Sequence, residues 1–541
     1  MLGWLVDQRY DERLFGLERL TNSATENLTA DGSRWAVSTP HSAATQAARE
    51  AFEGGGNAVD AALAAAVALA VVYPHMCGVG GDLFALVRQP DGATSAIVSA
   101  GAAPRGLDVA AVRARYDGAM PEHGPDTITV PGAVAGWETL RSLGALLPWS
   151  AAFAAAIDFA TDGVPVARSL ATTLAEDHGR FGADPGLASV FFAERRGLAP
   201  GAVLRQPALA ATMKDLAASG TAALYGGDVG IRYARGLKAT GSAMSIGDLV
   251  THRAVVAAPL RGHYRDLDLI VAPPPSQGYV LPQILALVER LGLVPDPMGN
   301  SAADLAHIFA ATAAGRDRDL ADPEAMRVTP AALLDGARLD ALTDIVSGHG
   351  DSIQPQRGTG DTISLVTVDA EGWAVSLIQS LYDAFGSGIL EPSTGIVAHN
   401  RGACFTLEPG HPNELAPGKR PAHTLMPALV ERRGALAAAI GTMGGEAQPQ
   451  INAANLMRVS DLGMSPGDAL SAPRWLVAGR EVSAEAGVDP VVTGALIEAG
   501  FDIRSLGELD GSAGHSNFIQ VSGGTFLAAA DPRADGSAAA G

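Results

Sequence analysis

Residues 358–369 have the sequence GTGDTISLVTVD, in which a glycine-rich segment leads directly into a run of β-branched and aliphatic residues. From residue 362 onward the residues alternate with a period close to two, which is typical of a buried strand. Thr362 is the first residue of this strand. A polar turn at residues 369–372 precedes a second run of the same kind, residues 373–380, so the sequence predicts an antiparallel hairpin.

The predicted hairpin admits two registers, which differ by one loop residue. A two-residue loop, Ala370–Glu371, places Thr362 opposite Gln379. One further loop residue places Thr362 opposite Ser380. In either register the hydroxyl of Ser380 lies near the hydroxyl of Thr362.

Thr362 itself admits two interpretations. Most short patterns of this kind are structural, and Thr362 is then an ordinary residue at the start of a strand. Alternatively, Thr362 is a latent N-terminal nucleophile. If the Asp361–Thr362 bond is cut, the new α-amine has a pKa near ~8 and can act as general base for the threonine hydroxyl. The preceding residues 348–360 are rich in Gly and Gln and predict a flexible loop, which favours the geometry that cleavage needs.

Length and charge limit the classes of protein to which the chain can belong. Its 541 residues, 47% of them hydrophobic, can bury a large core, and no low-complexity linker divides them, which favours one large layered unit over separate domains. The 38 basic and 58 acidic residues give a net charge of −20, and no basic cluster offers phosphates a surface. We therefore expect no nucleic-acid partner, and an anionic ligand would need a local arginine.

Cysteine usage and apolar runs argue against a disulfide framework, a metal site and a membrane span. Cys77 and Cys404 both lie in apolar, glycine-rich surroundings, which favours two buried thiols, and neither has zinc-site spacing. We expect no metal and no other cofactor. The N-terminus lacks a signal-peptide pattern, and the longest apolar run, residues 61–72, is shorter than the roughly 20 residues that cross a bilayer. The sequence thus predicts a soluble cytoplasmic protein.

The rest of the chain shows helical and strand patterns separated by Gly and Pro. Residues 1–34 are polar and irregular and predict an N-terminal extension, whereas residues 131–342 are mainly helical in pattern. The triple proline in residues 271–278 predicts a rigid surface turn. Single elements are predicted as strands at residues 35–39, 83–87 and 95–99, and as helices at residues 43–52 (capped by Ser42), 57–72, 134–143, 149–161, 206–218, 283–291 and 455–462.

Short motifs spread along the chain carry a resemblance to a known family. They are His41 with GGGNAVDAA at residues 54–62, Pro74-His75 with residues 78–81, GDT at 360–362, FGSGI at 385–389, KRP at 419–421, Gly444-Gly445, and DPR at 531–533. In this order they resemble the motifs of the γ-glutamyltranspeptidase family of N-terminal nucleophile (Ntn) hydrolases. The resemblance extends from about residue 35 to residue 535.

The resemblance implies a fold and a processing event. The fold is a four-layer αββα sandwich of the α/β (α+β) class. The chain is a precursor that cleaves itself between Asp361 and Thr362, which leaves a large chain of residues 35–361, preceded by the extension 1–34, and a small chain of residues 362–541. Both chains form one Ntn-hydrolase unit, and a further pairing of two units stays open. Mature Thr362 then attacks a small-molecule amide and forms an acyl-enzyme, which water or an amine releases.

The resemblance also implies roles for single residues. Thr362 is nucleophile and base, and Ser380 is the hydroxyl that supports the nucleophile. The backbone N–H groups of Gly444 and Gly445 form the oxyanion hole, in which one donor contributes roughly 3 kcal/mol in comparable sites.

The substrate pocket departs from the best-known family members. The family's carboxylate-binding arginine corresponds to Val109, its pocket asparagine to Tyr382, its amine-binding aspartate to Cys404, and its serine pair to His423 and Thr424. Without these charge pairs the pocket cannot select a zwitterionic glutamyl head in the family's usual way. The short segment 406–419 also implies a cleft more open than one covered by the family's lid-bearing loop.

Other residues offer replacements for the missing contacts. Arg401 and Arg105 are candidates to bind a substrate carboxylate, and the alternative for each is a solvated surface arginine. His423 either donates to a substrate carbonyl or is a satisfied core histidine.

Three functions follow as hypotheses. The first is a self-processing amidohydrolase whose pocket is similar to those of acylase or small-acid (oxamate-type) amidase relatives. The second is a true γ-glutamyl hydrolase or transpeptidase acting on glutathione-like substrates, with Arg401 or Arg105 in the place of the lost contacts. The third is an unprocessed, non-catalytic binding homologue, against which the intact Thr362, Gly444 and Gly445 argue.

Overall fold

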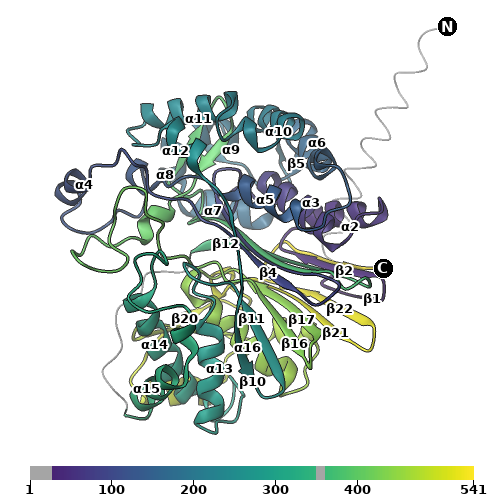
Figure 1. Ribbon diagram of the computed structural model, residues 1–541, viewed down its shortest axis with the longest axis vertical. Coiled ribbons are helices and arrows are strands. Elements are labelled where there is room, and N and C mark those ends of the chain that lie inside the picture. Colours follow the sequence, from purple (N-terminus) through teal and green to yellow (C-terminus); the bar gives the residue numbers. More distant parts are fainter. Residues whose placement is uncertain (1–26, 349–359) are drawn as a thin grey trace.

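The predicted hairpin lies in the middle of a seven-stranded antiparallel sheet (Figure 1). The structure, a computed structural model, describes residues 27–348 and 360–541. Strands β12 (Asp361–Asp369) and β13 (Ala374–Tyr382) are buried along almost their whole length, as their apolar composition predicts. Across the sheet the order is β23 (Ser537–Ala540), β2 (Trp35–Thr39), β12, β13, β3 (Asp82–Arg88), β4 (Thr94–Ser99) and β9 (Val255–Ala257).

A second seven-stranded antiparallel sheet packs face to face on the first. Its order is β1 (Thr29–Gly32), β22 (Thr525–Ala530), β21 (Ser516–Ser522), β17 (Ala435–Thr442), β16 (Ala428–Arg432), β11 (Leu267–Val271) and β10 (Leu260–Tyr264). The two sheets approach closely near the start of β12. Ser376 donates a hydrogen bond across the interface to the carbonyl of Ile440 at 2.7 Å, and a Cβ added at Gly441 would lie 3.1 Å from the Cβ of Ser364.

Helices cover the outer faces of both sheets, which produces the four layers αββα (Figure 1). The first sheet is covered by α2 (Ser42–Glu53), α3 (Ala58–Val72) and α5 (Ala133–Ser142), while α6 (Ala154–Asp162) packs on α3 and α10 (Pro207–Ser219) packs on α6. The second sheet is covered by α13 (Val280–Arg290) and α16 (Gln448–Ser460), and α14 (Ala302–Asp319) packs on α13. Helix α3 is buried over its whole length, because its alanine-rich sequence offers no polar face. The predicted fold class is confirmed.

Shorter elements complete the described chain. The remaining helices are α4 (Val109–Arg115), α7 (Arg168–Glu176), α8 (His178–Ala183), α9 (Pro185–Phe191), α11 (Asp228–Ala239), α12 (Ile246–Thr251), α15 (Gly336–Ser347), α17 (Pro466–Ser471) and α18 (Pro490–Glu498). The small sheets contain β14 (Ile389–Glu391) with β15 (Ile396–Ala398), β18 (Trp475–Ala478) with β19 (Glu481–Glu485) and β20 (Asp502–Leu506), β5 (Val164–Pro165) with β8 (Val203–Leu204), and β6 (Phe192–Ala193) with β7 (Arg196–Gly197).

Two boundaries predicted from the sequence are wrong. The extension of residues 1–34 is too long, because residues 29–32 form β1 and pair with β22. This edge strand is polar and half exposed, so it has no apolar pattern to reveal it. Helix α2 is capped by His41, whose Nδ1 accepts from the Ala43 N–H at 3.2 Å, and Ser42 is its first residue.

The stretch 131–342 is less helical than predicted, and its triple proline is not on the surface. Strands β9, β10 and β11 lie within it, and their short length hides them among helical patterns. Residues 271–278 are all buried, because the segment packs against Leu425 and His423 of the C-terminal half. Of the predicted loop 348–360, residues 349–359 lie outside the described residues.

Residues on both sides of the Asp361–Thr362 bond contribute strands to both sheets. The segment before the bond supplies β2, β3, β4 and β9 to the first sheet and β1, β10 and β11 to the second. The segment after it supplies the others, so the two parts share one interior. Within the described residues, no helix combines the length and apolarity needed to cross a bilayer.

Candidate active site

Thr362 and Ser380 face each other across the hairpin in the second of the two predicted registers. Ile363 pairs with Gln379, and this register places Thr362 opposite Ser380. Asp361 pairs with Tyr382, so the register shifts by one residue between residues 361 and 363. The Oγ atoms of Thr362 and Ser380 are 2.9 Å apart, and both residues are almost completely buried. Ser380 donates its single hydroxyl proton to the Asp361 carbonyl at 2.7 Å. Thr362 is therefore the donor between the two hydroxyls.

Asp361 presents its carbonyl to this hydroxyl pair and its side chain to a cavity. Burial and the nearby Asp383 raise the pKa of the Asp361 carboxyl from 3.8 to about 7. The peptide bond before Thr362 thus has a hydrogen-bonded carbonyl oxygen and a nucleophilic hydroxyl next to it. These are the groups that attack by Thr362 on its preceding carbonyl requires.

Gly444 and Gly445 lie in a tight turn after β17, the strand that faces β12 across the sheets. We call residues 443–446 the glycine turn. Gly444 has φ 137° and Gly445 has φ 51°, conformations that favour glycine. A Cβ at Gly444 would also lie 2.6 Å from Cδ1 of Ile451. Within the described residues, neither glycine N–H donates a hydrogen bond, so both donors are available to an anion.

Gln277 and Arg316 hold the glycine turn from one side. The side-chain amide of Gln277 donates to the carbonyl of Gly445 at 2.9 Å and to the carbonyl of Thr424 at 2.8 Å. Arg316 donates to the Gln277 side-chain oxygen at 2.9 Å and to the Glu446 carbonyl at 3.1 Å. Both residues precede the Asp361–Thr362 bond, so the turn depends on contacts from the large part of the chain.

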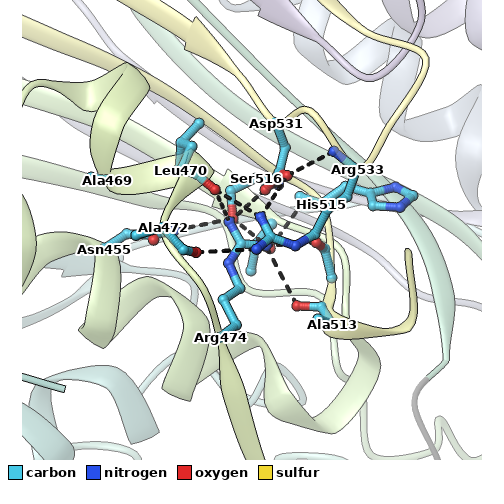
Figure 2. A network of polar contacts seen from close by, with 12 residues as sticks. Asn455, Ala469, Leu470, Ala472, Arg474, Ala513, His515, Ser516, Asp531 and Arg533 are labelled. Carbon is cyan, nitrogen blue, oxygen red and sulfur yellow. Dashed lines mark hydrogen bonds and ion pairs between the residues drawn. The ribbon is translucent and has the colours of Figure 1, made fainter. Parts of the chain in front are cut away.

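A buried ionic network, drawn in Figure 2, contacts the residues that pack on the other side of the glycine turn. Arg474 pairs with Asp531 and donates to the Gly514 carbonyl at 2.6 Å. Asp531 accepts from the Ser516 N–H at 2.9 Å, and the carbonyl of His515 accepts from the Met443 N–H at 2.7 Å. This chain of contacts fixes residues 513–516 against the start of the turn.

Arg533, the arginine of the DPR motif at residues 531–533, completes the same network. Arg533 forms two hydrogen bonds with Glu485, at 2.7 and 2.6 Å, and a third with Asp531 at 3.1 Å. Its Nη1 also donates to the Leu470 carbonyl at 2.7 Å. Because each buried charge here has an opposite charge beside it, the network forms a rigid base beneath the turn.

A cavity of about 270 Å³ lies beside the predicted substrate residues. We call it cavity A; it is lined by Gln277, Arg316, Cys404, His423, Thr424 and Glu446, among others. Cys404 is half-buried and borders the cavity, so the prediction of two buried thiols is correct only for Cys77. The structure therefore brings together three of the positions at which this chain departs from the best-known family members, namely Cys404, His423 and Thr424.

Arg401 lies directly behind the wall of cavity A. Its Nη1 donates to Cys404 Sγ at 3.3 Å and to Thr424 Oγ1 at 3.2 Å, and its guanidinium lies 4.2 Å from the ring centroid of Tyr382. The side chain is buried, its Nη2 has no hydrogen-bond partner, and no carboxylate of residues 27–348 and 360–541 lies within ion-pair distance. The solvated-surface interpretation is therefore wrong for Arg401.

The other two candidates have different environments. His423 is a core histidine: its Nε2 lies 3.1 Å from Asp82 Oδ2, and burial lowers its pKa well below the ordinary value. The same burial raises the pKa of Asp82 to about 7. Arg105 is exposed and lines a separate cavity with Asp248 and Arg420, so the structure does not join it to cavity A.

Sequence reasoning did not find the residues that hold the glycine turn. Gln277 follows the triple proline, and a polar residue beside a rigid turn was a signal of buried contacts. Arg316 and Arg474 carry no local signal, because their partners lie far away in the sequence. Among the described residues, no group of three or more His, Cys, Asp or Glu side chains could hold a metal ion.

Comparison with known proteins agrees with this geometry. The chain is 37% identical to the oxamate amidohydrolase proenzyme of Klebsiella pneumoniae over 92% of its length and 97% of the relative's. It is 34% identical to the glutathione hydrolase-like YwrD proenzyme of Bacillus subtilis over 95% of its length and 99% of the relative's. The crystal structure of cephalosporin acylase from Bacillus halodurans matches with a TM-score of 0.87 at 30% identity, over 95% of this chain and 97% of that one.

The match to a family confirms the resemblance seen in the motifs. The sequence model described as gamma-glutamyltranspeptidase matches residues 44–541, which is most of the chain. The matched range contains the Thr362–Ser380 pair, the glycine turn and cavity A. The chain therefore belongs to the γ-glutamyltranspeptidase family.

Proposed function

We propose that the chain is a self-processing amidohydrolase that acts on the amide of a small carboxylic acid. The relatives are named as amidohydrolase, hydrolase and acylase proteins, and two of them as proenzymes. The acid portion carries a second carboxylate, as oxamate does, and Arg401 binds that group. The observation that carries this proposal is the buried Arg401 guanidinium, whose Nη2 has no hydrogen-bond partner and whose Nη1 donates to Cys404 and Thr424 in the wall of cavity A.

Self-cleavage follows from the contacts at the Asp361–Thr362 bond. Thr362 Oγ attacks the Asp361 carbonyl carbon, and the C–N bond breaks to leave an ester and a free Thr362 amine. Water then opens the ester, which frees the Thr362 hydroxyl and a new carboxylate on Asp361. Ser380 donates to the carbonyl oxygen that gains negative charge, at 2.7 Å in the uncut chain. The products are residues 1–361 and 362–541, held together by strands that share both sheets.

After self-cleavage, Thr362 and the glycine turn act on the substrate amide. The Thr362 amine takes the hydroxyl proton, Oγ attacks the amide carbon, and the N–H groups of Gly444 and Gly445 donate hydrogen bonds to the developing oxyanion. The proton passes to the departing amine, and water hydrolyses the acyl-enzyme. Catalysis uses groups of this chain only, without a cofactor.

Arg401 explains which acid the site selects. A buried guanidinium with an unpartnered Nη2 and no described carboxylate within ion-pair distance is costly, and a substrate carboxylate with good hydrogen-bond geometry reduces that cost. Cys404 and Thr424, which line cavity A, accept hydrogen bonds from Nη1 and so connect the guanidinium to the wall of the cavity. A glutamyl group would also need a partner for its amine, and Cys404 stands where family members have an aspartate.

Mass and turnover measurements test the proposal. Under denaturing conditions the purified protein is expected to show two chains, the smaller beginning at Thr362, whose masses add up to the 55.1 kDa precursor plus one water. A single uncut chain after prolonged incubation would support the non-catalytic binding homologue instead. The processed protein is then offered oxamate, a neutral amide such as acetamide, and a chromogenic γ-glutamyl anilide. Substantial release of glutamate from the anilide would favour the γ-glutamyl hypothesis.

The variant Arg401→Met tests whether Arg401 binds the substrate carboxylate. Loss of a charge-assisted hydrogen bond costs about 1.5–3 kcal/mol, so kcat/KM for oxamate is expected to fall by roughly 10- to 150-fold. Turnover of a neutral amide is expected to change little, because it has no carboxylate to lose. An equal loss on both amides would reject Arg401 as the carboxylate ligand.

A further inference from the structure

A buried carboxyl group lies between two histidines, one of which, His423, lines cavity A. This group belongs to Asp82, the first residue of β3, whose side chain is only 1% exposed. Its Oδ1 accepts from the Gly101 N–H at 3.1 Å. Its Oδ2 lies 3.1 Å from His423 Nε2 and 3.6 Å from His399 Nδ1. We call Asp82, His399 and His423 the Asp82 cluster; the mechanism above does not use it.

Backbone contacts decide which ring nitrogen of each histidine carries the hydrogen. His399 Nε2 lies 2.9 Å from the carbonyl oxygen of Thr129, which can only accept, so Nε2 carries the hydrogen. His423 Nδ1 accepts from the Leu425 N–H at 3.4 Å, so its hydrogen is on Nε2 and is donated to Asp82. In the neutral His399 ring, the Nδ1 lone pair therefore faces Asp82 Oδ2. This Nδ1 has no hydrogen-bond partner among the described residues.

A proton between His399 and Asp82 removes the repulsion between their lone pairs, and its place is on Asp82. Burial lowers the pKa of His399 to about 3, and the charge of Arg401 lowers it further, so the ring stays neutral. Burial instead raises the pKa of the Asp82 carboxyl to about 7. The neutral acid can direct its hydroxyl toward His399 while Oδ2 accepts from His423. The cluster therefore favours the uncharged form of Asp82.

The Asp82 cluster and Arg401 lie on the same two segments of the chain. His399 precedes Arg401 by two residues, and His423 precedes Thr424, whose Oγ1 accepts from Arg401 Nη1 at 3.2 Å. The positive charge of Arg401 acts on the cluster, because it lowers the pKa of Asp82 and of both histidines. The coupling is mutual: an ionised Asp82 places a negative charge near Arg401, and a neutral Asp82 does not.

Two further titratable groups interact with the Asp82 cluster, and neither changes its charge between pH 6 and 9. Burial lowers the pKa of His252, which lies 3.2 Å from Ser99 Oγ, to about 4. Burial raises the pKa of Tyr225 far above its ordinary value of 10. Within the cluster itself, burial lowers the pKa of His423 well below 6.5. Asp82 is therefore the member of this group that titrates near neutral pH.

We propose that Asp82 is a specificity-determining residue, which as a neutral acid leaves the Arg401 charge to the substrate carboxylate and as a carboxylate weakens that binding. Asp82 acts through Arg401. The inference rests on the proposed function and adds to it a proton that controls the selection of carboxylates. Because coupling between two sites is reciprocal, a bound carboxylate raises the pKa of Asp82. Binding of the acid near pH 7.5 therefore takes up a proton from the solvent.

The first test measures kcat/KM for oxamate and for acetamide between pH 6 and 9. Titration of the Thr362 amine affects both amides and cancels in their ratio. In the wild type the oxamate-to-acetamide ratio is expected to fall about tenfold as the pH rises, since a nearby charge changes such equilibria by roughly one pK unit or more. In Asp82→Asn, which cannot ionise, the ratio is expected to stay constant within twofold.

Asp369→Asn is the matched control. Asp369 is also buried, its pKa is raised to about 6 by burial, and it accepts from the Ala58 N–H at 2.8 Å. It lies at the other end of β12 from Thr362 and lines neither cavity A nor the cavity of Arg105. This variant is expected to keep the wild-type fall in the ratio. A general loss of stability would affect Asp369→Asn and Asp82→Asn alike.

Calorimetry gives a second readout that needs no turnover. Oxalate is titrated into the processed protein at pH 7.5 in two buffers that differ in ionisation enthalpy, and the wild type is expected to take up a fraction of a proton that Asp82→Asn does not. Should Asp82→Asn fail to fold, the wild-type measurements still decide. A ratio independent of pH, or binding without proton uptake, would overturn the role of Asp82. Equal losses on both amides in Arg401→Met would instead reject the proposed function.

Discussion

The hydroxyl of Ser380 forms hydrogen bonds with three groups at this site. Its Oγ accepts from the Tyr382 N–H at 2.8 Å and from Thr362, and it donates to the Asp361 carbonyl. It therefore touches the attacking oxygen and the carbonyl oxygen at once. The N–H contact from Tyr382, a residue with φ 81°, holds Ser380 in this orientation.

Ser380→Ala is expected to slow self-cleavage by roughly 10- to 150-fold, because the carbonyl loses a donor worth about 1.5–3 kcal/mol where charge develops. The measurement is the rate at which the uncut chain disappears, followed by denaturing mass spectrometry. Ser376→Ala is the matched control: it lies on the same strand, is equally buried, and bonds Ile440 instead. If both variants cleave at the same rate, Ser380 has no special part in processing.

At the scale of elements, the position of the glycine turn depends on segments that are far apart in the sequence. Gln277 lies after β11, Arg316 lies in α14, and Arg474 lies before β18. Each holds backbone of the turn or of the residues packed on it. An oxyanion hole made of two N–H groups works only if both point at one position, so we propose that these contacts place the two donors.

Gln277→Ala is expected to lower kcat by roughly 10- to 100-fold with KM within about twofold, because misplaced N–H groups weaken binding of the transition state more than of the substrate. Gln283→Ala is the control. Gln283 is equally buried and also donates to a backbone carbonyl, that of Leu333 at 2.7 Å, away from the turn. Both variants should lose thermal stability, and only Gln277→Ala should lose kcat. Equal kcat in the two variants would contradict the positioning role.

At the scale of the whole molecule, the uncut chain contains a carboxyl group that resists ionisation. The pKa of Asp361 is raised to about 7 in the folded chain, against 3.8 for an ordinary aspartate. Such a group adds stability fully below pH 3.8 and loses that contribution as the pH rises to about 7. Buried histidines such as His75, whose pKa is lowered to about 3, act in the opposite direction, but only below about pH 6.5.

The uncut Thr362→Ala protein is therefore expected to have a lower thermal midpoint at pH 8 than at pH 6.5. Adding Asp361→Asn replaces the carboxyl with a neutral amide of similar shape and should reduce this difference. Other groups that titrate in this range, such as Asp82, are present in both proteins and cancel in the comparison. The same fall in midpoint with and without Asp361→Asn would show that Asp361 does not titrate there.

The sequence by itself determined the central hairpin, the Thr362–Ser380 pair and the four-layer class. These features depend on the local alternation of side chains and on short motifs, which can be recognised in the sequence without knowledge of the tertiary contacts. The sequence was misleading at β1 and at β9 to β11, because short or half-exposed strands have no pattern strong enough to separate them from their neighbours.

Only the tertiary structure decided which polar residues share a site. Arg401 and Arg105 were both candidates in the sequence, but one is buried behind cavity A and the other lies at a separate cavity. Gln277 and Arg316 join the glycine turn across more than a hundred residues. The physical reason is that a buried charge or amide is satisfied by whichever partner the fold brings near, and such contacts leave no periodicity along the chain.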